Sequence, residues 1–183
     1  MAVKKTKSWY KIVAPDYMDG AEIGTTLASE PSALVGKRVT ISAIELTNNF
    51  SKYYLKMTFK VSKVDGTMAS TDFDGSEVLR DYISRMILRR VRRIDTIQDF
   101  ITKDGKKIRV KGLAVIGRRI KSSIQKKVRS RIRDILKSSV EGETLESFLE
   151  KLITDEIKDK IMRDLRNIYP IRFFEIRKTQ IMG

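Results

Sequence analysis

An alternating stretch at Lys52–Val64, KYYLKMTFKVSKV, constrains the fold of this 183-residue chain more than any other feature. Apolar residues occupy every second position, which is the period of a β-strand with one buried and one exposed face. The stretch ends at Asp65-Gly66, a strong signal for a tight hairpin turn. We therefore predict that Thr67–Phe73 returns as the partner strand. The predicted buried face holds Tyr53, Leu55, Met57, Phe59 and Val61.

A second hairpin is predicted between Ile94 and Ile116, with its turn at Asp104-Gly105. Its outgoing strand changes phase at Gly112, as at a β-bulge. Two further runs, Trp9–Val13 and Arg38–Leu46, have the composition of strands. Strands in series with two tight hairpins favour an antiparallel barrel or sandwich over a parallel sheet.

Three stretches have helical periodicity: Ser76–Arg92, Arg119–Ser138 and Thr144–Ile168, the last with a possible division at Thr154-Asp155. The third has an apolar face of Leu145, Phe148, Leu149, Leu152, Ile157 and Ile161. Pro170 ends this helix, and Ile171–Ile181 reads as a strand that returns to the sheet.

These elements predict an α+β fold: an antiparallel β-barrel-like body with helices inserted and following, and a C-terminal strand returning to the sheet. We expect one domain over residues 1–183. Its predicted parts are a basic arm (1–8), a mainly β body (9–116) with a helix near 76–92, a helical segment (117–168) and the returning strand (170–181).

The charge of the chain is concentrated in one segment. Lys and Arg number 38 against 23 Asp and Glu, a formal net charge of +15. Residues 85–133 hold 18 of these cations and only three acids, so the entire surplus lies there. Like charges on neighbouring helical turns repel by about a few tenths of a kcal/mol per pair. A polyanionic partner that relieves this repulsion is the natural explanation.

The basic helix carries an apolar stripe that predicts docking on the sheet, made of Ile120, Ile124, Val128, Ile132 and Ile135. Cations project from the opposite side.

A membrane-surface helix would usually bring Trp, Phe or Leu to the apolar face, so nucleic acid is favoured over a membrane. RNA is favoured over DNA because no homeodomain, zinc-finger or zipper pattern occurs. The predicted RNA-binding residues are Lys4, Lys5, Lys7, Arg85, Arg89, Arg90, Arg92, Arg93, Arg118, Arg119, Lys121, Lys126, Lys127, Arg129, Arg131 and Arg133.

The sequence contains few of the residue patterns that catalysis requires. The chain has no His and no Cys, which excludes Ser-His-Asp triads, thiol nucleophiles and most zinc sites. Gly36-Lys37 fails the phosphate-loop pattern because Pro31 and Arg38 stand at key positions. We predict no enzyme, no cofactor and no metal.

The alternative is a metal-dependent ribonuclease using Asp72 and Asp74. A helix cap and a turn at Asp74-Gly75-Ser76 are the simpler explanation of these acidic residues. A protein-interaction module that docks a partner on its third helix is a further alternative.

In order along nearly the whole chain, seven blocks resemble the archaeal and eukaryotic small-subunit ribosomal protein family S3Ae, also called eS1. They are KSWYKIVAP (Lys7–Pro15), IGTTL (Ile23–Leu27), LVGKRV (Leu34–Val39), TDFDG (Thr71–Gly75), KDGKKIRV (Lys103–Val110), IKSSIQKKVRSRIR (Ile120–Arg133) and IYPIRFFEIRK (Ile168–Lys178).

The resemblance implies a structural constituent of the cytoplasmic ribosome that supports the small-subunit platform near the messenger exit during translation. The implied partners are small-subunit ribosomal RNA and neighbouring ribosomal proteins, with messenger RNA near by, and neither membrane nor DNA. The family defines no catalytic residues.

Overall fold

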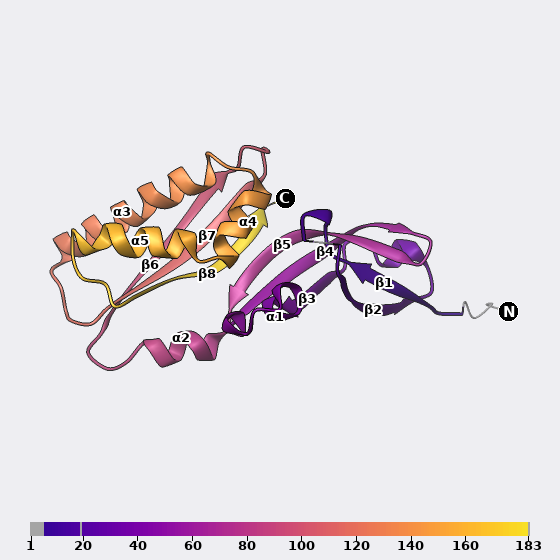
Figure 1. Ribbon diagram of the computed structural model, residues 1–183, viewed down its shortest axis with the longest axis horizontal. Helices are drawn as coiled ribbons and strands as arrows, with labels where there is room; N and C mark the ends of the chain where they lie inside the picture. Colours follow the sequence, from indigo (N-terminus) through magenta and orange to yellow (C-terminus); the bar gives the residue numbers. More distant parts are fainter. Residues whose placement is uncertain (1–5, 19, 183) are drawn as a thin grey trace. The chain divides into compact units, whose positions relative to one another are not determined.

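The structure is a computed structural model that describes residues 6–18 and 20–182 (Figure 1). These residues form eight β-strands and five α-helices, a mixed α+β fold as the sequence predicts. The chain divides into two compact units, one up to Ser76 and one from Glu77. Each is described by itself.

Strands dominate the first unit, and their order is β2-β1-β5-β4-β3. β1 and β2 are antiparallel, as are β3 and β4, whereas β1 and β5 are parallel. The bounds are β1 Ser8–Val13, β2 Glu22–Ala28, β3 Arg38–Ser42, β4 Leu55–Asp65 and β5 Met68–Val78, with the short helices η1 Asp16–Met18, η2 Pro31–Ala33, α1 Ala43–Thr47 and η3 Phe50–Lys52.

The alternation in β4 has the predicted consequence. Leu55, Met57, Phe59 and Val61 are all buried, while Lys56 and Lys60 between them are exposed. Gly66 has φ +58°, the left-handed conformation that a tight turn requires here. Tyr53 was placed on the buried face, and this is wrong: it precedes the strand and its side chain is 49% exposed.

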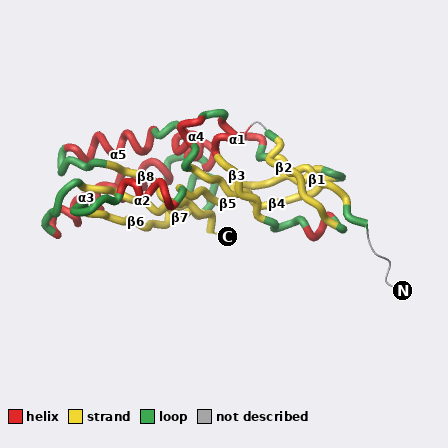
Figure 2. The backbone as a smooth tube through the Cα atoms, turned by 90° about the horizontal axis from the view of Figure 1, so that it is seen from below, coloured by secondary structure: helices red, strands yellow, loops and turns green. Residues whose placement is uncertain are grey.

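The second unit contains the antiparallel strands β6 Arg92–Ile101, β7 Lys107–Ile116 and β8 Phe173–Met182, with β7 in the middle. Helix α3 packs along β6, and α5 packs along β8 and beside α3 (Figures 1 and 2). The returning C-terminal strand is therefore confirmed. The helices of this unit are α2 Arg80–Met86, α3 Ser122–Val140, α4 Leu145–Ile153 and α5 Glu156–Arg166.

One predicted break in regular structure is confirmed, and the other is found opposite its predicted position, because the extra residue belongs to β8 while β7 pairs regularly with β6 through Gly112. Asp155 has φ +64° between α4 and α5, so the third predicted helix is divided where Thr154-Asp155 indicated. The register of β7 with β8 shifts between Lys111 and Gly112, and Arg177 is the additional residue on β8. A Cβ at Gly112 would lie 2.7 Å from the Thr96 Oγ1 and 3.3 Å from the Phe174 ring. Glycine is needed there because the Phe174 ring lies against the strand.

Barrel closure is not confirmed, because the sheet is open. Among the described strands β2 pairs with β1 alone, β3 with β4 alone and β6 with β7 alone. Hydrophobic alternation reports which face of a strand is buried, but it does not report which strand lies at an edge.

Three element boundaries also differ from the predictions. The helix expected near 76–92 is confined to α2, because β5 continues to Val78 and the chain leaves the helix at Ile87. The strand expected over Arg38–Leu46 ends at Ser42, where α1 begins. The sequence analysis predicted no strand at Glu22–Ala28, where β2 lies.

Replacing Gly112 by Ala is expected to lower the free energy of unfolding by about 1–3 kcal/mol, because the new methyl group overpacks Thr96 and Phe174. Gly117→Ala is the matched control, since a Cβ at Gly117 meets no heavy atom within 4 Å. Urea denaturation of both variants measures the difference, and equal stabilities would contradict the account of the bulge.

The single-domain interpretation stays a prediction. Strand β5 runs without interruption through the boundary between Ser76 and Glu77, so we expect the two units to unfold together. Calorimetry should then give one transition whose calorimetric and van't Hoff enthalpies agree. Two resolved transitions would mean that the units are separate domains.

Candidate nucleic-acid interface

Helix α3 holds its cations outward because its apolar residues are buried in the second unit. Val128, Ile132, Ile135, Leu136 and Val140 have at most 4% of their surface exposed. Ile120 lies before the helix and Ile124 is half-buried, so the stripe starts and ends later than predicted. On the outer side, Lys126, Lys127, Arg129 and Arg133 are exposed, as the helical spacing requires.

The pairing of β6 with β7 brings two separate basic segments to one end of the sheet. Arg92 is opposite Ile116 and Arg93 is opposite Val115, so the start of β6 lies beside the end of β7. The connection that enters β6 carries Arg89 and Arg90, and the connection that leaves β7 carries Arg118, Arg119 and Lys121. All are exposed.

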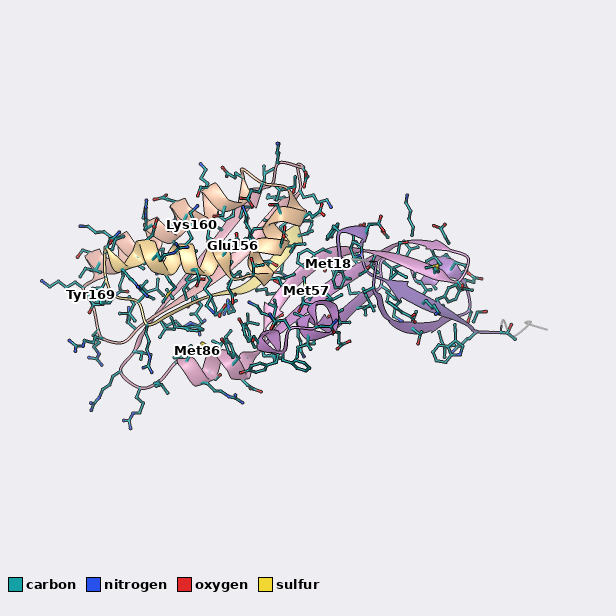
Figure 3. All side chains as sticks on the ribbon, viewed as in Figure 1. Met18, Met57, Met86, Glu156, Lys160 and Tyr169 are labelled. Carbon is teal, nitrogen blue, oxygen red and sulfur yellow. The ribbon has the colours of Figure 1, made fainter. Side chains whose placement is uncertain are left out.

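A third connection, from α5 to β8, ends at the same place (left in Figure 1). The Arg172 backbone N–H donates a hydrogen bond to the Val115 carbonyl at 2.9 Å, and the Arg172 side chain is exposed. Tyr169 marks this connection in Figure 3. We call Arg89, Arg90, Arg92, Arg118, Arg119, Lys121 and Arg172 the basic end.

Sequence reasoning missed Arg172, because it lies outside the segment that holds the charge surplus. A signal was present: Pro170 predicts the start of a strand that rejoins the sheet, and such a strand would carry Arg172 to a sheet end. The sequence could not say which end.

Most of the predicted RNA-binding cations in the described part of the chain have no acidic partner there. Within residues 6–18 and 20–182, no ion pair involves any of the following: Lys7, Arg85, Arg89, Arg90, Arg118, Arg119, Lys121, Lys126, Lys127 or Arg133. Arg92 donates to the neutral Gln125 side chain, from Nε at 3.2 Å and Nη2 at 3.1 Å. Their charge is therefore available to an external anion.

Two of the predicted RNA-binding cations form ion pairs with acidic side chains. Arg93 donates from Nε and Nη2 to the two Asp95 carboxylate oxygens, each at 2.8 Å, and this hydrogen bonding raises the pKa of Arg93. Arg131 Nη2 lies 2.8 Å from Asp164 Oδ2 and joins α3 to α5. Arg129 donates to the Asp95 backbone carbonyl at 3.3 Å.

The start of α3 adds to the positive potential of the basic end. Its N-cap is Lys121, which makes no side-chain capping bond, and its first turn has no acid. The partial positive charge of a 19-residue helix is thus left without a local carboxylate. Arg90 has φ +68°, a conformation that disfavours residues other than Gly, Asn and Asp.

The predicted basic arm is described in part. Lys4 and Lys5 lie outside the described residues, and Lys7 is exposed just before β1 in the first unit. All sixteen assignments to RNA binding remain predictions, since the geometry gives exposure and charge but no ligand.

Asp72 and Asp74 do not form a metal centre in the described part of the chain. Both lie in β5, and the Arg38 Nε donates to Asp74 Oδ2 at 2.7 Å. Residues 6–18 and 20–182 contain no group of three or more metal-ligating side chains. The cap and turn expected at Asp74-Gly75-Ser76 is wrong, because these residues continue the strand. The ribonuclease alternative is unsupported.

No described helix combines the length and apolar character that crossing a membrane requires.

Comparison with known proteins gives one consistent family. The model described as the ribosomal S3Ae family matches residues 3–183. The chain is 38% identical over 178 residues to the small ribosomal subunit protein eS1 of Methanothermobacter thermautotrophicus, covering 97% of this chain and 91% of that protein. It is 34% identical over 182 residues to the protein of the same name from Methanopyrus kandleri, covering 97% and 86%.

Replacing Arg131 by Gln should lower the free energy of unfolding by about 0.2–1 kcal/mol, because its ion pair with Asp164 is half exposed. Arg133→Gln, on the same helix and without an ion pair, should leave stability unchanged or raise it slightly. Urea denaturation at low and high salt measures both. Equal losses would contradict the distinction between engaged and free cations.

Proposed function

Because the chain belongs to the ribosomal S3Ae family, we propose that it is a structural constituent of the small ribosomal subunit that binds ribosomal RNA through its basic end. Family membership makes the chain a non-enzymatic protein of the cytoplasmic ribosome, in agreement with the sequence prediction. The observation that carries RNA binding is that three chain connections meet at one end of the sheet, and that their cations have no acidic partner among the described residues.

The mechanism is electrostatic. Cations fixed on the basic end and on the outer side of α3 replace the counterions condensed on the RNA backbone, and the released ions drive binding. The arginines suit this role because a planar guanidinium donates two parallel hydrogen bonds to phosphate oxygens. Phosphate contacts of this kind fix position and orientation without reading base sequence.

A position on the platform near the messenger exit, with ribosomal proteins and messenger RNA close by, belongs to the same proposal. It rests on the family resemblance of the ordered sequence blocks. Cross-linking of intact small subunits followed by mass spectrometry tests it. Cross-links from Lys121 or Lys126 to RNA of another part of the subunit would refute the position but leave RNA binding intact.

The basic end is tested by the double variant Arg118→Gln, Arg119→Gln. If about six to ten phosphates are contacted, affinity for small-subunit RNA should fall roughly 10³- to 10⁵-fold between 50 and 200 mM salt in the parent protein. The double variant should bind more weakly and lower the slope of log affinity against log salt by about 1–2.

The control is the double variant Lys103→Gln, Lys106→Gln, which removes two exposed cations from the opposite end of the same hairpin. Its salt slope should match that of the parent protein. A parent protein whose binding does not respond to salt would refute the proposed mechanism, as would equal effects of the two double variants.

A further inference from the structure

The second unit also contains a cleft of about 510 Å³ that the basic end does not include. It lies between α2, the end of β5 and the strands β6 and β8, and Glu77 is the acid among its lining residues. Arg93 is one of its lining residues, and the preceding Arg92 bonds to Gln125 on α3. Successive side chains of a strand point to opposite faces, so the cleft is on the face of the sheet away from α3.

Four cations line one side of the cleft, and two of them have no acidic partner among the described residues. Arg93 is held by Asp95, and Lys178 Nζ lies 3.0 Å from the Glu77 carboxylate. Arg80 and Arg177 also line the cleft, and neither pairs with an acid in the described part of the chain. Arg177 is only half exposed, so its positive charge is partly removed from water without a compensating carboxylate.

The β-bulge is the reason why two consecutive β8 cations line one cleft. In a regular strand Arg177 and Lys178 would point to opposite faces. Here Gly112 is opposite Ile176 and Lys111 is opposite Lys178, so Arg177 is the extra residue of the bulge. Bulges redirect side chains in this way and recur beside functional sites. The bulge therefore places both Arg177 and Lys178 at the cleft.

The other side of the cleft is apolar. Ile83 and Ile87 of the α2 segment line it, with Ile83 8% exposed and Ile87 half-buried. A cleft with cations on one side and aliphatic side chains on the other complements a phosphate joined to a flat apolar ring. Its volume lies within the range of about 300–1,000 Å³ that is usual for small-ligand sites.

We propose that this cleft holds one unpaired nucleotide of RNA, with its phosphate on Arg80 and Arg177 and its base against Ile83 and Ile87. The inference rests on the proposed function and adds a ligand subsite to it. Bases inside a duplex are stacked and cannot enter, whereas an unpaired base can be turned out and packed against apolar side chains. The RNA strand could continue from the cleft to the basic end over a short distance, because Arg89 and Arg90 of the basic end follow Ile87 closely in the chain.

The test uses the full chain with Arg80→Gln and Arg177→Gln, singly and together. Lys103→Gln, Lys106→Gln is again the control of equal charge. Fluorescence anisotropy measures binding to a short single-stranded RNA, to the same strand in a duplex and to a matching strand with abasic positions. Thermal unfolding of each variant confirms that it is folded.

We expect the cleft double variant to bind single-stranded RNA about 10-fold more weakly than the control does, with equal affinity of both for the duplex. The parent protein should also bind the abasic strand more weakly than the complete one. Ile87→Ser should reduce binding of the complete strand but not of the abasic strand, since it changes the apolar side alone.

Three results would overturn the inference: cleft variants that bind single strands as the control does, an equal loss for the duplex, or equal affinity of the parent for complete and abasic strands. The last would mean that the cleft holds a phosphate alone. Failure of the proposed function is distinguishable, because the parent protein would then bind none of the RNAs in a salt-dependent manner.

Discussion

The register of β6 with β7 is the constraint on which the rest of the second unit depends. With Arg92 opposite Ile116, the connections before β6 and after β7 must leave the sheet at the same end. A shift by one residue would move every buried side chain of β6 to the other face, so the apolar pattern itself fixes the register. Ile94 and Phe100 are buried on the face that α3 covers, next to Ala114 and Ile108. Core packing therefore determines where the cations gather.

The far end of the same hairpin is held differently. Asp104 in the turn accepts a hydrogen bond from the Leu145 backbone N–H at 2.7 Å and so satisfies a free donor at the start of α4. A carboxylate at a helix N-terminus is favourable because of the helix dipole. One hairpin thus has an acid at the helix start near its turn, whereas the helix start at its open end has Lys121. The starts of the two helices therefore differ in charge because their sequences differ.

The sequence predicts elements well where one strong local pattern decides them. Strand β4, the turn at Gly66 and the division at Asp155 follow from periodicity or from a residue with special backbone freedom, whereas the bulge expected at Gly112 has its extra residue on β8. Strand β2 was missed because Glu22–Ala28 combines Gly24 with a weak alternation, and only Ala28 of the strand is buried. The limits of α2 were missed because Ser76 and Val78 fit a helix locally, and only their pairing within the sheet makes them strand.

The candidate site divides in the same way. Charge counting along the chain found Arg89, Arg90, Arg118 and Arg119, because they lie in two dense basic segments. Arg172, Arg80 and Arg177 were not found, since they lie outside the segment that holds the charge surplus. Strand pairing carries Arg172 to the basic end, and the bulge turns Arg177 toward the cleft that Arg80 also lines. Counting charges along the sequence does not predict ion pairs either. Arg131 and Arg133 look alike in the sequence, and only the packing of α3 against α5 brings Asp164 to Arg131.

The distribution of acids completes the argument for a polyanionic partner. On the sheet face away from α3, two cations of the β6–β7 hairpin are matched: Arg93 with Asp95, and Arg109 with Asp99, whose pKa is lowered by the hydrogen bonds from Arg109. Lys158 is likewise paired with the buried Glu175. The chain thus neutralises its cations in many places, yet none of the carboxylates in residues 6–18 and 20–182 pairs with Arg118, Arg119 or Lys121. A surface selected for stability alone would balance these charges, since their mutual repulsion has a cost and an acid would relieve it. Phosphates in place of the missing carboxylates would remove this cost, which is the physical ground for the proposal that RNA completes the basic end.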